Sequence, residues 1–143
     1  MVRRTDTGEG PLASTFVSVT EPHPGEPQLA SIRRLTLAGA DGQSLGENHV
    51  ALELESATGV RDVVIALDAE DPLGLTPGWK RGEQVLLPEL GIATDAELAL
   101  VRLDASGQVI HVALCKGGVM RIGAVEWQAG AAQEFVEGHF PPK

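Results

Sequence analysis

The sequence has no tyrosine and few other aromatic residues, three phenylalanines and two tryptophans. Its single cysteine, Cys115, cannot form a disulfide within the chain, and the apolar context VIHVALC is typical of a small buried side chain. Uninterrupted apolar runs such as VVIAL are far shorter than the roughly 18 residues that a membrane-spanning helix needs. These absences exclude a disulfide scaffold and a membrane-spanning helix.

Basic residues are also scarce, because 11 Lys and Arg stand against 20 Asp and Glu and give a net charge of −9. Nucleic acids and anionic membrane surfaces attract proteins through Lys and Arg, so neither is an expected partner. The beginning, MVRRTDTGEGPLAS, lacks the apolar core of a signal peptide. The expectation is a cytoplasmic chain or one that lacks its natural beginning.

What the sequence does contain is alternation of period two, over a length of 143 residues that suits one domain. In HVALELES, residues 49–56, Val50, Leu52 and Leu54 alternate with polar or small residues, which predicts a half-buried strand. DVVIALD follows after an ATG turn, so the two segments predict a β-hairpin.

Further strands are expected in EQVLLPEL, ELALVRLD and QVIHVALC, and after a turn at KGG in VMRIGAVEW. The last three predict an antiparallel meander, and AAQEFVE near the end fits either a helical turn or a final strand. The predicted fold is an all-β, antiparallel β-sandwich of about eight to nine short strands, with a barrel-like arrangement as second choice.

Residues 1–12 are predicted to be a lead-in or interdomain linker remnant, and residues 13–143 a single β-sandwich domain that opens with the strand ASTFVSVT. The three prolines of TEPHPGEPQ are expected to end that strand and turn the chain rigidly. Gly25 is expected to permit a backbone conformation that other residues resist.

Catalytic, cofactor and metal motifs are missing from this sequence. His23, His49, His111 and His139 are too scattered for metal-ligand spacing, and His111 is expected to pack on a sheet face. The acids of DAEDP, Asp68, Glu70 and Asp71, lack the order of a calcium loop and are interpreted as a solvated turn. No catalytic residue, cofactor site or metal site is therefore assigned.

A carbohydrate contact is the one binding site that the residues suggest. Sugar-binding modules use exposed aromatic faces, and Trp79 in TPGWKRGE, beside Lys80 and Arg81, is the best candidate, ahead of Trp127. The alternative interpretation of Trp79 is a structural side chain that covers the edge of the sandwich.

The run STFVSVTEPHPGEPQLASIRRL, residues 14–35, resembles the start of the carboxyl-terminal β-sandwich region of bacterial heparinase II/III-like polysaccharide lyases. The resemblance continues through HVALELES, RDVVIALD and VIHVALCKGGVMRIGAVE, and so spans most of residues 14–126. Members of that family are modular secreted or periplasmic enzymes. An α-helical toroid and an antiparallel β region cleave acidic polysaccharides by β-elimination, with Tyr and His as acid and base.

The resemblance implies an accessory module rather than a catalyst, since the chain has no tyrosine and is too short to hold the toroid. The implied partners are the catalytic domains of a larger chain, with polysaccharide contact secondary because a charge of −9 opposes an acidic polymer. Two alternatives stay open. One is a carbohydrate-binding or adhesive module, and the other is a small enzyme built around His111.

Overall fold

The computed structural model describes residues 15–22, 24–69 and 79–138, and these form an all-β domain with one short helical turn. The described strands belong to one nine-stranded sheet in which each pair of neighbouring strands is antiparallel, so the predicted fold class is confirmed. The strands are β1 Leu29–Leu35, β2 Ala38–Gly39, β3 Val50–Ser56, β4 Arg61–Ala66, β5 Val85–Leu87, β6 Ile92–Thr94, β7 Leu98–Leu103, β8 Val109–Ile122 and β9 Val125–Gly138. The 3-10 helix η1 spans Pro88–Leu90.

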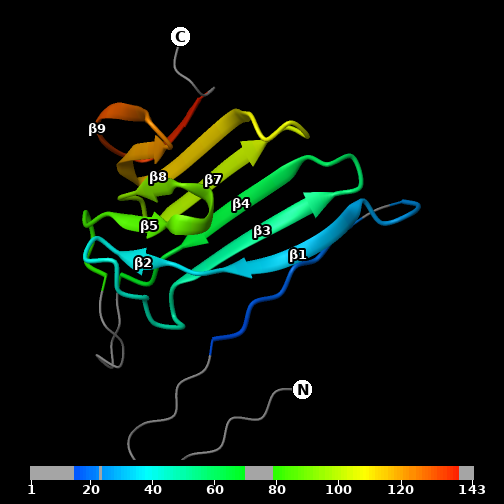
Figure 1. Cartoon of the computed structure of the whole chain (residues 1–143), viewed down its shortest axis with the longest axis horizontal. Coiled ribbons are helices and arrows are strands. Elements are labelled where there is room, and N and C mark those ends of the chain that lie inside the picture. The colour runs from blue at the N-terminus through cyan, green and yellow to red at the C-terminus, as the bar shows by residue number, and fades with distance from the viewer. Residues whose placement is uncertain (1–14, 23, 70–78, 139–143) are drawn as a thin grey trace, which may run out of the picture.

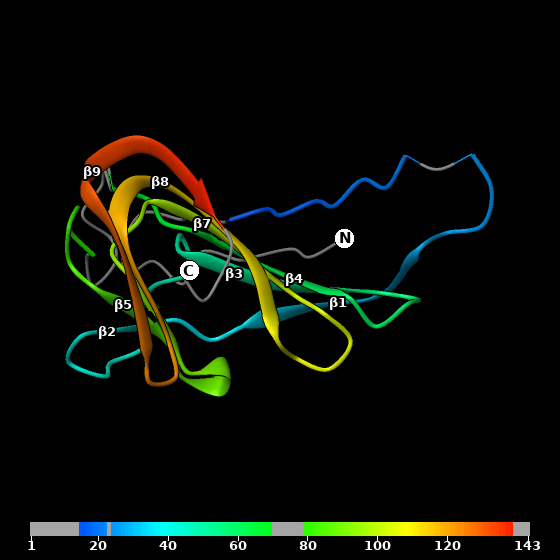
Figure 2. The same ribbon diagram turned by 90° about the horizontal axis from the view of Figure 1, so that it is seen from above.

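The sheet curls into a half-barrel because the long strand β8 belongs to two layers. The strand order is β1-β3-β4-β7-β8-β6-β5-β2, with β9 paired to the other edge of β8. The first half of β8 pairs with β7 and the second half pairs with β6. In Figure 1, β2 and β5 therefore lie in front of the layer formed by β1, β3, β4 and β7, and Figure 2 shows the same curl from above.

The bend in β8 occurs at Gly117, where the pairing with β9 also shifts register. A Cβ placed on Gly117 would lie 2.3 Å from the Cα of Ala96, so only glycine allows the two backbones to come this close. The Asp95 carboxylate accepts hydrogen bonds from the amides of Gly118 and Val119, both at 2.9 Å. The residues between β6 and β7 thus fix the point at which β8 turns from one layer to the other.

The hydrophobic core fills the concave side of the half-barrel. It includes Val63 and Ile65 of β4, Val101 of β7 and Leu114 of β8, all essentially inaccessible to solvent. The predicted hairpin of β3 and β4 is confirmed, with its turn at Gly59 in a positive φ of 81°. We call the concave side of the sheet, which holds this core, the inner face, and the opposite side the outer face. Strand residues that pack in the core therefore lie on the inner face.

The two faces of β3 are used in an unexpected way. Ala51 and Glu53 are the buried residues of the strand and face inward, whereas Val50, Leu52 and Leu54 are only half-buried and lie on the outer face. The alternation predicted from HVALELES is confirmed, but its apolar set does not enter the core. Ala51 fits opposite Ile65 across the hairpin because a small side chain leaves room for a large one.

Three predicted boundaries are wrong. The KGG segment is not a turn, because β8 continues through it and the turn to β9 comes at Gly123, with φ 59°. EQVLLPEL contains only the three-residue strand β5 before η1. The described part of ASTFVSVT, residues 15–20, is extended but belongs to no strand. The segment AAQEFVE belongs to β9, so the final-strand alternative holds and the helical turn does not.

The proline-rich corner before β1 is held by a side chain rather than by a left-handed glycine. The Glu21 carboxylate accepts hydrogen bonds from the backbone amides of Gln28 at 2.6 Å and Leu29 at 3.0 Å. Gly25 does not have a positive φ, and a Cβ there would meet nothing within 4 Å. The expectation that this corner needs a glycine for its backbone conformation is therefore wrong. The predicted lead-in, residues 1–12, lies outside the described residues.

Over the described residues, the structure contains no helix with the length and apolarity needed to cross a membrane.

Candidate functional site

The predicted carbohydrate contact does not have an exposed aromatic platform. Trp79 is 4% exposed and packs in the hydrophobic core, while its indole N–H donates to the backbone carbonyl of Glu83 at 2.6 Å. Lys80 and Arg81 are exposed, and Arg81 pairs with the carboxylate of Glu97. The structure therefore agrees with a structural role for Trp79, and a sugar contact by Lys80 and Arg81 stays a prediction.

A chain of ion pairs crosses the inner face at the open end of the half-barrel. Glu53 of β3 lies between two guanidinium groups, with its carboxylate 2.9 Å from Arg33 and 3.1 Å from Arg61. Arg33 also contacts the carboxylate of Glu89 in η1 at 2.6 Å. Hydrogen bonds to Glu53 and then to Glu89 raise the pKa of Arg33 above its ordinary value.

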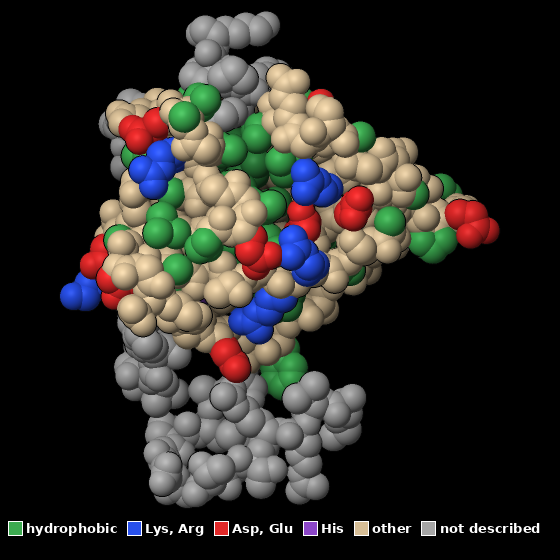
Figure 3. All heavy atoms as spheres, in the orientation of Figure 1, with side chains coloured by type: hydrophobic (Ala, Val, Ile, Leu, Met, Phe, Trp, Pro, Cys, Tyr) green, Lys and Arg blue, Asp and Glu red, His purple; other side chains and the backbone are tan. Residues whose placement is uncertain are grey.

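Figure 3 shows this arrangement on the face turned toward the viewer in Figure 1. Basic and acidic side chains alternate along a line that crosses β4, β3 and β1, and hydrophobic side chains gather beside it over β7 and β8. Each of the two arginines of the ion-pair chain has a carboxylate partner, so the charges largely cancel. Such a network orders the rim of the sheet and offers no unbalanced charge to a ligand.

The histidines do not assemble an acid-base site among the described residues. His111 of β8 lies on the outer face opposite Arg102, and its Nε2 is 3.8 Å from a Glu137 carboxylate that is itself largely exposed. Arg102 forms a two-bond pair with Asp62, whose hydrogen bonds raise the pKa of Arg102. His111 thus packs on a sheet face, as expected, and lies beside a carboxylate on an open surface.

The remaining candidates from the sequence divide between the described and undescribed residues. His49 is buried, and its Nδ1 accepts the backbone amide of Asp68 at 3.2 Å. His23, Glu70, Asp71 and His139 lie outside the described residues. Within the described ranges, no group of three or more His, Cys, Asp or Glu side chains could hold a metal ion.

The outer face carries an apolar surface that the sequence analysis did not identify. One row crosses five strands through successive register partners, and a second row lies beside it. The first row is Val50, Ala66, Leu98, Cys115 and Phe135, and the second is Leu52, Val64, Leu100 and Ala113. We call these two rows the outer apolar surface. Leu98 and Phe135 are 47% and 58% exposed, which is high for large apolar side chains that lie on one face.

The sequence did contain a signal for this surface. In ELALVRLD, Ala99 and Val101 face the core while Leu98 and Leu100 face outward, so both sides of β7 are apolar. A strand that is apolar on both sides is typical of a sheet that is covered on both faces. The pattern therefore indicated a second contact surface as well as a core.

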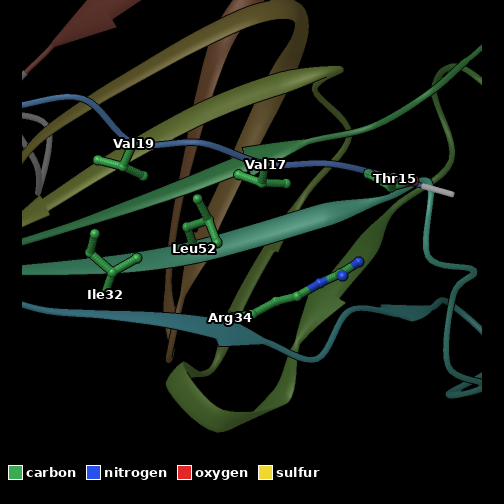
Figure 4. A pocket seen from close by; sticks show the side chains of 6 residues that line it. All are labelled: Thr15, Val17, Val19, Ile32, Arg34 and Leu52. Carbon is green, nitrogen blue, oxygen red and sulfur yellow. The ribbon is translucent and has the colours of Figure 1, made fainter. Parts of the chain in front are cut away.

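A groove lies on the outer face beside the edge strand β1, and the chain's own amino-terminal segment forms one of its walls. It has a volume of about 390 Å³. Figure 4 shows Val17 and Val19 of that segment above Leu52 of β3 and Ile32 of β1, with Thr15 and Arg34 at one end. The two adjacent arginines of β1 thus lie on opposite faces of the sheet, because Arg33 forms the ion pairs of the inner face and Arg34 lines the groove of the outer face.

Comparisons with protein-family models, with curated proteins and with solved structures found no match for this chain.

Proposed function

We propose that this chain is an accessory, non-catalytic β-domain that packs through its outer apolar surface against the catalytic domains of a larger enzyme. The observation that carries the proposal is the pair of apolar rows across β3, β4, β7, β8 and β9. Contiguous exposed apolar side chains on a globular domain are typical of protein contact sites. The exposed Leu98 and Phe135 would be anchors of that contact, since buried apolar side chains contribute most of the energy in such interfaces.

The described chemistry supports a role without catalysis by this domain. The carboxylates of the inner face are bound to arginines, and His111 has its carboxylate neighbour on an open surface. The curled sheet encloses a packed core on its concave side. A domain of this kind is suited to hold other domains in place.

The proposal includes a parent enzyme similar to heparinase II/III-like polysaccharide lyases, and this part rests on the sequence resemblance alone. A secreted or periplasmic location for the parent protein belongs to the same proposal. The carbohydrate-binding alternative has less support, because Trp79 is in the core and Trp127 of β9 is half-buried beside it.

A lyase assay tests the absence of catalysis. The purified chain is incubated with uronate polymers such as heparan sulfate, hyaluronan and alginate, and the absorbance of unsaturated uronate is followed. We expect no increase above a no-protein control. A steady increase that scales with protein concentration would show that the domain is itself a lyase.

The docking surface is tested with the region that flanks these residues in the same reading frame, which we expect to contain a helical domain with Tyr and His. Calorimetric titration of the separately produced region should show binding. Leu98→Asp should weaken that binding by about 2 kcal/mol, roughly 30-fold, because it places a charge among anchors. Val125→Asp, at the exposed first residue of β9 beside the β8–β9 turn, is the matched control. Equal effects of the two changes would contradict docking through the outer apolar surface.

A further inference from the structure

One wall of the groove beside β1 is a peptide, residues 15–20 of the same chain, which lies over the outer face of β1 and β3. Val17 and Val19 are two residues apart in an extended segment, so both point toward the same side. They lie above Leu52 and Ile32, which belong to neighbouring strands of the sheet (Figure 4). The outer face of β1 and β3 thus lies opposite branched aliphatic side chains at alternate positions of an extended backbone.

The hold on this segment is weak. Within the described part of the chain, residues 15–20 form no hydrogen bond with the sheet and belong to no strand. Phe16 is 83% exposed and Val17 is 46% exposed, although both are large apolar residues. The segment therefore lies over the sheet without hydrogen bonds to it, and another peptide of the same form could take its place.

We propose that the outer face of β1 and β3 beneath residues 15–20 is a binding site for an extended segment of a partner protein with branched aliphatic side chains two residues apart. Residues 15–20 are an intramolecular competitor that occupies the site until the partner segment displaces them. This inference rests on the docking role of the outer face and names the form of the partner at its β1 edge. It does not depend on the assignment of the parent enzyme as a lyase.

The charge at one end of the groove adds a preference for an acidic residue. The Arg34 guanidinium donates to the backbone carbonyls of Glu47 at 2.9 Å and His49 at 3.4 Å, and among the described residues it has no carboxylate partner. Thr15 lies at the same end (Figure 4). A partner segment with Asp or Glu at the position of Thr15 would bring an opposite charge to Arg34.

Fluorescence anisotropy with labelled peptides tests the site in the full chain. The probe is TFVSVT, and the proteins are the wild type, Val17→Asp/Val19→Asp, and that variant with Ile32→Asp added. Releasing the intramolecular segment should strengthen probe binding by about tenfold or more, since less of the site is then occupied. Ile32→Asp should abolish binding. A probe with Glu in place of Thr15 should bind about threefold more tightly, and Arg34→Met should remove that gain.

The controls separate release of the segment from other effects. Phe16→Asp adds a charge to the same segment outside the groove lining and should behave as the wild type. If the protein with Ile32→Asp does not unfold cooperatively and so is not properly folded, Ile32→Ala replaces this change and should weaken binding of the probe. Equal probe binding by the wild type and Val17→Asp/Val19→Asp would overturn the proposal.

A second result would also overturn the proposal, namely a wild-type dimer in sedimentation that Val17→Asp/Val19→Asp converts to a monomer. Residues 15–20 would then bind a second copy of this chain and not compete with a partner protein. Lyase activity of the isolated chain would refute the proposed function and leave the peptide measurements valid.

Discussion

Gly117→Ala tests most directly how β8 bends from one layer of the half-barrel to the other. A Cβ at this position would lie 2.3 Å from the Cα and 2.7 Å from the amide nitrogen of Ala96. Both contacts are with backbone, so no side chain can rotate away and the bend of β8 has to move. Overpacking of this kind costs about 1–3 kcal/mol, and the backbone contacts place Gly117→Ala near 3 kcal/mol. Since 1 kcal/mol shifts Tm by roughly 2–4 °C in larger domains, Tm should fall by about 6–12 °C.

Urea unfolding followed by tryptophan fluorescence measures this loss, because Trp79 is buried in the folded core and becomes exposed on unfolding. The urea midpoint should fall while the slope of the transition stays the same. Gly25→Ala is the matched control, since its Cβ would meet nothing within 4 Å and its φ is not positive. It should be neutral or stabilise by about 0.4–1 kcal/mol through the unfolded chain. If Gly117→Ala matched this control, the close approach of β8 to Ala96 would be wrong.

The other predictions concern polar groups. Asp95→Ala removes the acceptor of two β8 amides and should cost about 1–3 kcal/mol in the same titration, with a smaller loss for Asp95→Asn. Hydrogen bonds from Ser106 and then from a backbone amide lower the pKa of Asp104, so its contribution is complete above the ordinary carboxyl pKa and is lost as pH falls through the folded value. Ser106→Ala should therefore raise the pKa of Asp104 in an NMR titration, and an unchanged value would refute the assignment. Glu53→Gln removes the carboxylate shared by Arg33 and Arg61, of which Arg33 keeps Glu89. It should cost about 2 kcal/mol, less than the loss of a fully buried pair because both arginines are partly exposed.

Local patterns were sufficient for the strands that lie in the middle of the sheet. The alternation in DVVIALD and ELALVRLD predicted β4 and β7, and the short glycine-bearing turns predicted their neighbours β3 and β8. These elements depend on residues close in the sequence, and hairpin partners are adjacent in the chain. The expectation that His111 packs on a sheet face also came from its place between Ile110 and Val112 in a single strand.

Distant contacts decided the elements that were predicted wrongly. Lys116, Gly117 and Gly118 have the composition of a turn, yet β8 runs through them because the Asp95 carboxylate binds the following amides. Lys116 even adopts a positive φ of 52° within the strand, which is uncommon for a residue with a side chain. The residues around KGG do not indicate that a carboxylate more than twenty residues earlier binds there, so the continuous strand could not be predicted from them.

The sequence by itself determined that this protein is a sheet of short antiparallel strands, because a period of two is set by the geometry of each strand alone. Only the tertiary structure decided which side of each strand is inside. Glu53 is buried because Arg33 and Arg61 reach it from neighbouring strands and satisfy its charge. Leu52 faces outward and lines a groove together with the chain's own amino-terminal segment. Alternation gives two faces to every strand, and the choice between them depends on partners that are distant in the sequence.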